Sequence, residues 1–293
     1  MGLGGHLMWT AVFREIKKKR PAGKIIFTNP PSLKDRLFGK KYGVPVRSEV
    51  FVNNPYLSYP ESIEDGDDLI VIHPNEDRYN YHSLILDDRV EFKPGHVIRI
   101  ICREFNIEQP DLKCELYFSE SETKKIEELV TNKIGNDFIV IEPHTKDYFT
   151  VNKGWYFNKW QAVVDQLVKN HLIVQVGTPG VEILDGVMSF VGELTFRESL
   201  ALIGRGRLLF TSEGGLMHGA NAVNTPSVVI FTGFNSPALT GYPENINLYS
   251  DIECSNCGLR KMCNIGWKCR DAITPTAVVE AANKLLSGAP SFK

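Results

Sequence analysis

Residues 207–231, RLLFTSEGGLMHGANAVNTPSVVIF, contain the groups in this chain best suited to holding a phosphate. The apolar runs 207–211 and 227–231 are typical of strands buried on both faces. Between them, EGGLMH at 213–218 opens a helical segment with its histidine in the first turn. A helix N-terminus offers unpaired backbone N–H groups, and neighbouring glycines let a bulky anion approach them. The segment predicts a diphosphate site, with a tight turn and a satisfied histidine as the alternative.

A second group of reactive side chains lies nearer the C-terminus, where four of the six cysteines fall within sixteen residues. They are Cys254, Cys257, Cys263 and Cys269. Four thiolates at such spacing can surround zinc or iron, and a reducing compartment disfavours disulfides. Three states stay open: a structural zinc or iron, reduced and packed thiols, or two disulfides. Cys102 and Cys114 stand apart from this cluster and are predicted to be core thiols.

The composition is that of an ordinary globular protein. The 293 residues, 43% hydrophobic and 23% charged, suffice for two domains. A net charge of −2 gives no overall attraction for nucleic acid, which is not expected as a partner. No apolar stretch reaches the ~20 residues that span a bilayer, and the beginning of the chain lacks a secretory pattern. We expect a cytoplasmic protein with at most peripheral contact at the inner face of the membrane.

Strand and helix signals alternate along the first half, which favours parallel sheets with helical crossovers. We expect a helix over 9–19, strands over 24–28 and 68–73, and a helix over 96–105. The polar segment 119–136 is predicted to be a helix and turn, and it is the best candidate for a domain boundary.

The second half begins again with an apolar strand that runs into a loop. Its predicted elements are strands 138–145, 172–177, 207–211 and 227–231, and helices 158–169, 197–204 and 275–288. Asn158 and Thr274 are expected to cap the first and last of these helices, while Thr195 and Glu198 have the spacing of a capping box. Two α/β halves, each too small to enclose a large ligand, suggest a cleft between them.

Residues 190–243 resemble the donor-binding half of glycosyltransferase family 9, the ADP-heptose:lipopolysaccharide heptosyltransferases and their relatives. The hallmark is Asp-Ser/Thr-Gly-x-x-His, an alanine-rich helix, a proline, an apolar strand, and a loop containing glycine and proline. The matching residues here are Glu213, Gly214, Gly215, Leu216, Met217, His218, Ala220, Ala222, Pro226, Val228 to Phe231, Gly233 and Pro237. The resemblance extends through 142–160 and weakly covers the N-terminal half.

The resemblance implies an α/β fold of the GT-B class, in which two Rossmann-like doubly wound domains face a cleft. It implies 1–125 as the acceptor domain, 137–274 as the donor domain with the cysteine-rich loop 254–269, and 275–288 as a C-terminal helix. The implied activity is an inverting, metal-independent sugar transfer from a nucleotide-diphosphate donor to a glycan or other hydroxyl acceptor, in lipopolysaccharide biosynthesis. An ADP-sugar is the favoured donor, a heptose is one candidate sugar, and catalysis requires no cofactor. Some relatives have similar cysteines in this loop and bind iron through them.

Specific roles follow from matching this sequence to the family pattern. His218 and the backbone of Gly214 and Gly215 would hold the donor diphosphate, with Lys153 as a cationic contact and Thr145 nearby. Glu182 would meet the ribose, and Leu194 would lie near the base. Fixed donors or cations suit this place because the leaving diphosphate gains charge in the transition state.

Two departures from the family pattern affect the expected chemistry. The family usually has Asp at the position of Glu213, so the donor sugar and base stay open. The segment 2–18 matches the family's N-terminal glycine loop except that Gly5 stands where the family has its candidate catalytic Asp. The neighbouring His6 has an ordinary pKa near ~6.5 and is the replacement candidate for the base, the alternative being a loop histidine that lines the cleft.

The family begins with an apolar strand before the glycine loop, and only Met1 precedes it here. Loss of a central strand would leave its neighbours without hydrogen-bond partners. We expect a chain shortened at its start.

Two other functions remain open beside sugar transfer. A nucleotide-sugar epimerase of the same fold would need carboxylates converging on the sugar ring. A non-catalytic subunit that binds a nucleotide sugar or serves in assembly is suggested by Gly5 in place of the family's Asp.

Overall fold

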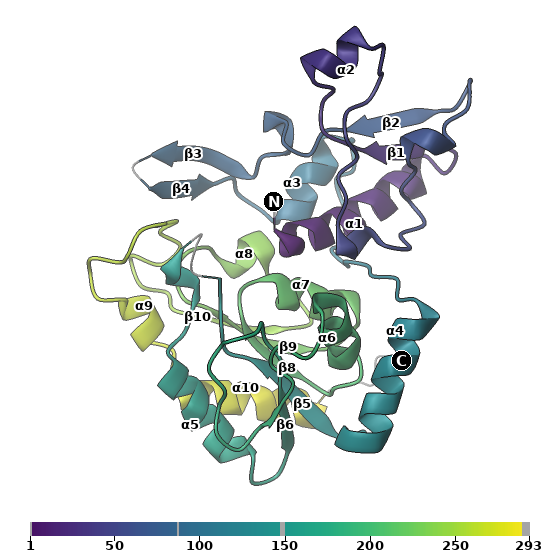
Figure 1. Ribbon diagram of the computed structural model, residues 1–293. Helices are drawn as coiled ribbons and strands as arrows, with labels where there is room; N and C mark the ends of the chain where they lie inside the picture. The colour runs from purple at the N-terminus through teal and green to yellow at the C-terminus, as the bar shows by residue number, and fades with distance from the viewer. Residues whose placement is uncertain (1, 87, 147–149, 289–293) are drawn as a thin grey trace.

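The computed structural model describes residues 2–86, 88–146 and 150–288 (Figure 1). Two α/β halves lie against each other, the N-terminal half in purple to blue and the C-terminal half in teal to yellow. A polar helix, α4 (Glu120–Leu129), follows the crossing between them. Among the described residues, no helix is both long enough and apolar enough to cross a bilayer.

The C-terminal half is built on a six-stranded parallel sheet in the order β10-β9-β8-β5-β6-β7. The strands are β5 (Phe138–Glu142), β6 (Leu172–Gln175), β7 (Met188–Ser189), β8 (Leu209–Ser212), β9 (Ser227–Phe231) and β10 (Ile246–Tyr249). The central strands β8 and β9 are buried along their whole length, as their continuous apolar runs require. The sheet therefore forms the middle layer of this half.

Helices cover both faces of this sheet. One face packs against α5 (Phe157–Leu167) and α10 (Pro275–Gly288), and the other packs against α6 (Phe196–Ile203) and α7 (Gly215–Ala222). Two short helices, α8 (Pro237–Thr240) and α9 (Lys268–Asp271), lie in the loops after β9 and β10. The carboxyl ends of the parallel strands meet at one edge, where ligands bind in open α/β sheets.

The N-terminal half has a smaller sheet. The parallel strands β1 (Lys24–Phe27) and β2 (Leu69–Ile72) pair with each other, and β3 (His82–Leu86) and β4 (Arg89–Phe92) form an antiparallel hairpin. The helices are α1 (Leu3–Lys19), α2 (Leu33–Leu37) and α3 (Val97–Arg103). Among the described residues, no strand precedes α1.

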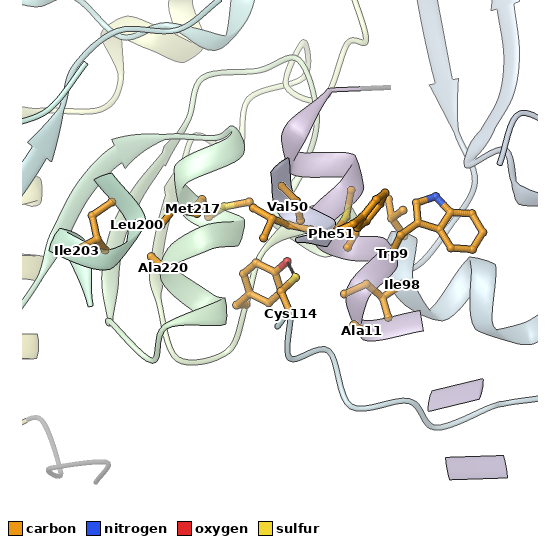
Figure 2. Packing of buried hydrophobic residues seen from close by; sticks show 14 of the residues in the cluster. Trp9, Ala11, Val50, Phe51, Ile98, Cys114, Leu200, Ile203, Met217 and Ala220 are labelled. Carbon is orange, nitrogen blue, oxygen red and sulfur yellow. Dashed lines mark hydrogen bonds between the residues drawn. The ribbon is translucent and has the colours of Figure 1, made fainter. Parts of the chain in front are cut away.

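One apolar core continues from the N-terminal half into the C-terminal half (Figure 2). Figure 2 shows Met217 of α7 facing Val50 and Phe51 of the N-terminal half, with Trp9 of α1 beyond them. All four side chains are 5% exposed or less. The two halves are thus in direct contact where α1 lies beside α7.

The local predictions hold at most helix ends and fail at two. Thr195 and Glu198 form the predicted capping box, and the hydroxyl of Thr274 accepts a hydrogen bond from the N–H of Ala277 at 3.2 Å. Asn158 does not cap α5, because the helix begins one residue earlier, after Tyr156. The expected glycine loop before residue 9 is also wrong, since α1 already begins at Leu3.

Candidate functional site

The glycine turn predicted from the sequence lies at the carboxyl end of β8. Glu213 follows the strand directly, Gly214 precedes α7, and α7 begins at Gly215. His218 lies in the first turn of this helix and is 3% exposed. The turn therefore directs the backbone N–H groups of α7 towards the edge where the strands end.

Lys153 and Glu213 meet at this edge although sixty residues separate them in the sequence. The Lys153 Nζ lies 2.6 Å from the Glu213 Oε2, and 5.2 Å from the centre of the Phe234 ring. Burial opposes ionisation of the Glu213 carboxyl, but the Lys153 ammonium, together with His218 and Asn235, outweighs it and holds the pKa of that carboxyl below its usual value. The Glu213 carboxyl is consequently ionised at neutral pH.

His218 is held by a short chain of hydrogen bonds. Its Nδ1 lies 2.6 Å from the Tyr242 hydroxyl, which lies 3.1 Å from the Cys114 Sγ. Burial lowers the pKa of His218 to about 3, so the ring is neutral at physiological pH. Burial also raises the pKa of Tyr242 well above its ordinary value, so the phenol keeps its proton. A neutral imidazole has one N–H to donate.

The first turn of α1 covers the N-terminus of α7. A Cβ placed on Gly4 would lie 2.8 Å from Cδ2 of His218 and 3.3 Å from Cα of Gly215. Only glycine permits this approach without displacement of the histidine or of the α7 backbone. Two helix N-termini, one from each half, therefore converge beside the glycine turn, and both present positive dipole ends.

His6, the sequence candidate for the base, lies in this same turn of α1. Its Nδ1 lies 2.9 Å from the Ser48 hydroxyl, and its ring centre lies 5.1 Å from that of Phe51. Burial lowers the pKa of His6 to about 4. The ring is neutral at pH 7 and can accept a proton, although it is a weaker base than an exposed histidine.

The other predicted donor residues lie at different distances from this cluster. A Cβ on Gly154 would come within 2.9 Å of the Thr145 hydroxyl, which places Thr145 beside the neighbour of Lys153. Glu182 is exposed in the loop after β6, where its carbonyl accepts a hydrogen bond from the Gln175 side chain at 2.9 Å. The described contacts do not join Glu182 to the Lys153 group.

Leu194 lies in the loop after β7, next to the capping residue of α6. Its side chain is half-buried and packs against the core shared by the two halves. Residues 147–149, inside the segment that resembles the family, lie outside the described residues.

The structure adds polar groups that were not singled out from the sequence. The Asn235 side chain hydrogen-bonds to the Glu213 carboxylate, and the Thr240 hydroxyl lies 3.5 Å from its Oε1. Burial and the Glu213 carboxylate together raise the pKa of Tyr81 to about 12, which places Tyr81 of the N-terminal half near this carboxylate. From the loop 233–243, only Gly233 and Pro237 were matched to the family pattern. The polar side chains of Asn235, Thr240 and Tyr242 were therefore not predicted to belong to the site.

Glu142 is a further titratable group at the carboxyl end of the sheet. It ends β5, beside Thr211 of β8, and its Oε1 accepts a hydrogen bond from the His144 N–H at 3.2 Å. Burial raises the pKa of Glu142 to about 8. A carboxyl group that titrates near neutrality beside the glycine turn is typical of functional sites.

The four clustered cysteines line one pocket of about 310 Å³ beside the Lys153 segment. All six cysteines of the chain are unpaired, so the disulfide alternative is not observed, and Cys102 and Cys114 are fully buried as predicted. Asn152 anchors the loop: its Nδ2 donates to the carbonyls of Leu259 and Lys261 at 2.7 and 2.6 Å. Among the described residues, no three metal-binding side chains are arranged to hold an ion.

The parallel sheet, the polar cluster at its carboxyl edge and the second α/β half beside it define a protein of the GT-B class. A family model described as glycosyltransferase family 9 (heptosyltransferase) matches residues 95–266, more than half of the chain. The chain belongs to glycosyltransferase family 9, and the protein is a glycosyltransferase. No curated protein sequence matches it at a significant level.

Three solved structures share the fold along nearly the whole chain. The glycosyl transferase family 9 from Veillonella parvula is 17% identical, covers 98% of this chain and 95% of its own, and has a TM-score of 0.70. The ADP-heptose lps heptosyltransferase II of E. coli is 18% identical over 97% and 96%, with a TM-score of 0.62. The iron-containing heptosyltransferase TibC from enterotoxigenic E. coli, in complex with ADP-D-beta-D-heptose, is 17% identical over 98% and 74%, with a TM-score of 0.66. These likenesses confirm the GT-B fold expected from the sequence.

Proposed function

We propose that the protein transfers a heptose from an ADP-heptose donor to a hydroxyl group of a lipopolysaccharide glycan, with inversion and without a metal ion. The observation that carries the proposal is the meeting of Lys153, Glu213 and His218 at the N-terminus of α7. The names of two structurally similar proteins support the ADP-heptose part. In this proposal residues 137–274 bind the donor, 1–125 bind the acceptor, and 275–288 form a C-terminal helix.

The leaving group is the part of the reaction for which this site is best equipped. As the bond between the anomeric carbon and the diphosphate oxygen breaks, negative charge grows on the diphosphate. Backbone N–H groups of Gly214 and Gly215, the Lys153 ammonium and one N–H of His218 would receive that charge. Fixed donors of this kind take the place of a metal ion in stabilising the leaving group.

The hydrogen-bond chain behind His218 determines which ring nitrogen faces the donor. Sulfur is a weak acceptor, so the favoured arrangement has the Cys114 S–H donating to the Tyr242 oxygen and the Tyr242 O–H donating to Nδ1 of His218. The ring proton then resides on Nε2. A neutral His218 fixed in this tautomer contributes one directed N–H to the diphosphate.

In a single inverting displacement, the acceptor oxygen attacks the anomeric carbon and its proton passes to a base. We assign His6 as that base, since it is neutral at pH 7 and shares a helical turn with Gly4, beside the glycine turn. A bound diphosphate would raise the pKa of His6 by Coulomb attraction for the imidazolium form. The pKa of about 4 without ligand favours a second candidate function, a subunit that binds the nucleotide sugar without transfer.

The remaining roles complete the donor site. Thr145, beside Gly154, would donate to a phosphate oxygen. Glu182 would accept from the ribose hydroxyls, and Leu194 would pack against the base. Both lie in loops that leave the carboxyl side of β6 and β7, where an extended nucleotide would reach them.

The test is nucleotide release from ADP-, GDP- and UDP-sugars, with and without a crude glycan acceptor. We expect acceptor-dependent ADP release from ADP-heptose, unchanged by EDTA, and a product whose anomeric configuration is opposite to that of the donor by NMR. His218→Ala should abolish release, and His6→Ala should lower turnover while donor binding persists.

Each competing function has its own outcome in this assay. Binding of a nucleotide sugar without turnover in every combination supports the non-catalytic subunit. Epimerised sugar formed without acceptor supports an epimerase. Retained configuration, or loss of activity in EDTA, would contradict the mechanism proposed here.

For the cysteine loop we propose a structural zinc or iron, held by Cys254, Cys257, Cys263 and Cys269. The support is that four thiols line one pocket and that this loop contacts the donor site: the Cys257 N–H donates to the Gly233 carbonyl at 2.8 Å, next to Phe234. In the described structure the four thiols are not close enough together to hold a metal ion, so metal binding would require them to move closer. Metal analysis of the purified full chain should find one equivalent of zinc or iron in the parent protein and much less in Cys254→Ser. An equal metal content in the two proteins would overturn the proposal.

A further inference from the structure

The segment of residues 33–47, named here the α2 loop, extends from the N-terminal half at the end remote from the C-terminal half (Figure 1). Its neck is closed by two backbone hydrogen bonds: Asn29 N–H to the Val44 carbonyl at 3.0 Å, and Val46 N–H to the Phe27 carbonyl at 2.9 Å. Gly43 permits this closure, since a Cβ there would lie 2.2 Å from the Asn29 carbonyl oxygen. The loop is therefore a defined projection of the fold.

The α2 loop is not held in place by buried apolar side chains. Helix α2 buries none of its residues. A capping box between Ser32 and Asp35 begins the helix, and Lys40 pairs with Asp35 at 3.1 Å. Short helices are normally stabilised by packing an apolar face, which this one lacks within the chain.

The apolar side chains of the loop are exposed to an unusual degree. Leu33 and Leu37 are each 77% exposed, Phe38 is 74% exposed and Val44 is 67% exposed. Leu33 and Leu37 are four residues apart, so they lie on the same side of the helix. Grouped large apolar side chains on a surface mark an interaction site.

Charge identifies the partner of this surface. The α2 loop carries five basic residues and one acidic residue, a net charge of +4 in a chain whose total is −2. The single acid is already paired with Lys40, and within the described part of the chain Lys34, Arg36 and Lys41 form no ion pair. Basic residues interspersed with exposed leucine and phenylalanine suit an anionic bilayer, where cations meet headgroups and apolar side chains enter the acyl boundary.

We propose that the α2 loop docks the protein on the surface of an anionic lipid bilayer, with Leu33, Leu37 and Phe38 inserted and Lys34, Arg36 and Lys41 at the headgroups. This placement is independent of the donor and of the mechanism proposed above. It leaves the polar cluster at α7 free, because that cluster lies at the opposite side of the N-terminal half.

The test is flotation of the full chain with vesicles of phosphatidylcholine alone or with about 30% phosphatidylglycerol as the anionic lipid. We expect binding to the anionic vesicles, little to the neutral ones, and weakening by salt. Reversal of three charges, in Lys34→Glu/Arg36→Glu/Lys41→Glu, should lower the partition coefficient by roughly a hundredfold. The apolar variant Leu33→Ser/Leu37→Ser/Phe38→Ser should also lose most binding.

A matched control reverses three exposed charges outside the α2 loop, in Lys124→Glu/Lys133→Glu/Lys169→Glu, and should keep vesicle binding. Thermal unfolding of both loop variants should match the parent protein, because α2 buries nothing. The proposal is overturned if the parent protein does not float, if neutral and anionic vesicles bind alike, or if the control loses as much binding as the charge variant. It is also overturned if the apolar variant binds the anionic vesicles as well as the parent protein, which would show attraction by charge alone without insertion. A change in oligomeric state without loss of vesicle binding would indicate a second copy of the chain as the partner and would likewise overturn it.

Discussion

The Lys153 ammonium and the Glu213 carboxylate form a pair without net charge at the proposed donor site. The Lys153 side chain remains 22% exposed, whereas that of Glu213 is 5% exposed. An ammonium group has three N–H donors, so Lys153 can hold Glu213 and a phosphate oxygen together. Glu213 thus acts as a positioning residue that keeps the cation at the edge of the sheet.

Variants of Lys153 and Glu213 should affect the free energy of unfolding and the binding of ADP differently. Lys153→Met leaves a buried carboxylate without its partner and should lower the free energy of unfolding by roughly 3 kcal/mol. The double variant Lys153→Met/Glu213→Gln should regain most of that stability but still fail to bind ADP, as measured by urea unfolding and calorimetry. Recovery of ADP binding in the double variant would show that Lys153 does not contact the donor.

Tyr242 tests the tautomer assigned to His218. Tyr242→Phe removes the hydroxyl that donates to Nδ1, so the Nε2–H form loses its preference and the KM for the donor should rise roughly fivefold to tenfold. Steady-state kinetics with varied donor would measure this, with Tyr249→Phe, an exposed tyrosine on β10, as the control. Unchanged kcat and KM in Tyr242→Phe would contradict the tautomer assigned to His218.

At the level of elements, α1 and α7 contact each other at their N-terminal ends. Each helix comes from a different half, and Gly4 lies at their contact, where a Cβ would come 2.8 Å from the His218 ring. Alanine at an interior helical position is normally more favourable than glycine by about 1 kcal/mol. The contact with His218 should reverse that preference here.

Gly4→Ala should therefore weaken ADP binding, since the added methyl group displaces His218 or the α7 backbone. Gly2→Ala is the matched control, because a Cβ at Gly2 has no heavy atom within 4 Å. Calorimetric titration of both variants with ADP would decide: equal affinities would show that the α1 contact does not position the site.

Helix α3 is capped by a buried histidine, which makes its stability dependent on pH. His96 is 5% exposed, its Nδ1 accepts a hydrogen bond from the Ile98 N–H at 3.2 Å, and burial lowers the pKa of His96 to about 4. Between pH 6.5 and 4 the unfolded chain binds the proton and the folded chain does not, so stability falls as the pH falls through this window.

His96→Asn keeps an N-cap acceptor but removes the titrating ring. The variant should lose less stability than the parent protein on going from pH 7 to pH 4.5, by up to about 3 kcal/mol. Urea unfolding at both pH values measures the difference. Parallel losses in the two proteins would mean that His96 does not contribute to the acid sensitivity.

Across the whole molecule, two buried arginines hold the crossing segment between the halves. Arg14 of α1 donates to the carbonyls of Asp111 and Lys113 at 2.8 and 2.5 Å. Arg197 of α6 donates to the carbonyls of Glu49 and Tyr117 at 2.9 and 2.7 Å. The relative position of the halves therefore depends on these contacts as well as on the shared core.

Arg197→Met should destabilise the protein by roughly 3 kcal/mol, because it removes the hydrogen bonds to the Glu49 and Tyr117 carbonyls together with the ion pair to Glu122. The hydrogen bond from Arg197 holds the pKa of Glu122 at about 2, below its ordinary value, so the substitution also removes an interaction that stabilises the folded chain at neutral pH. Arg205→Met on the same stretch is the control, since its pair with Glu127 is about half exposed and contributes little. Equal thermal unfolding of the two variants would contradict this role.

The sequence by itself determined the C-terminal half well, because local rules govern it. Buried parallel strands need continuous apolar runs, and helix starts need capping side chains; β9 and the cap of α6 follow these rules residue by residue. The glycine turn before α7 and its histidine were also predictable, since their spacing in the chain is short. The first turn of α1 was not, because the contact of Gly4 with His218 and Gly215 exists only in the assembled fold.

Tertiary structure alone decided which distant groups meet. The pair of Lys153 with Glu213, and the chain from Cys114 through Tyr242 to His218, join residues far apart in the sequence. Burial then decided their protonation: it makes His6 and His218 weak bases and brings the Glu142 carboxyl to titrate near neutrality. Desolvation and long-range pairing depend on the assembled core, and no local pattern of residues encodes them.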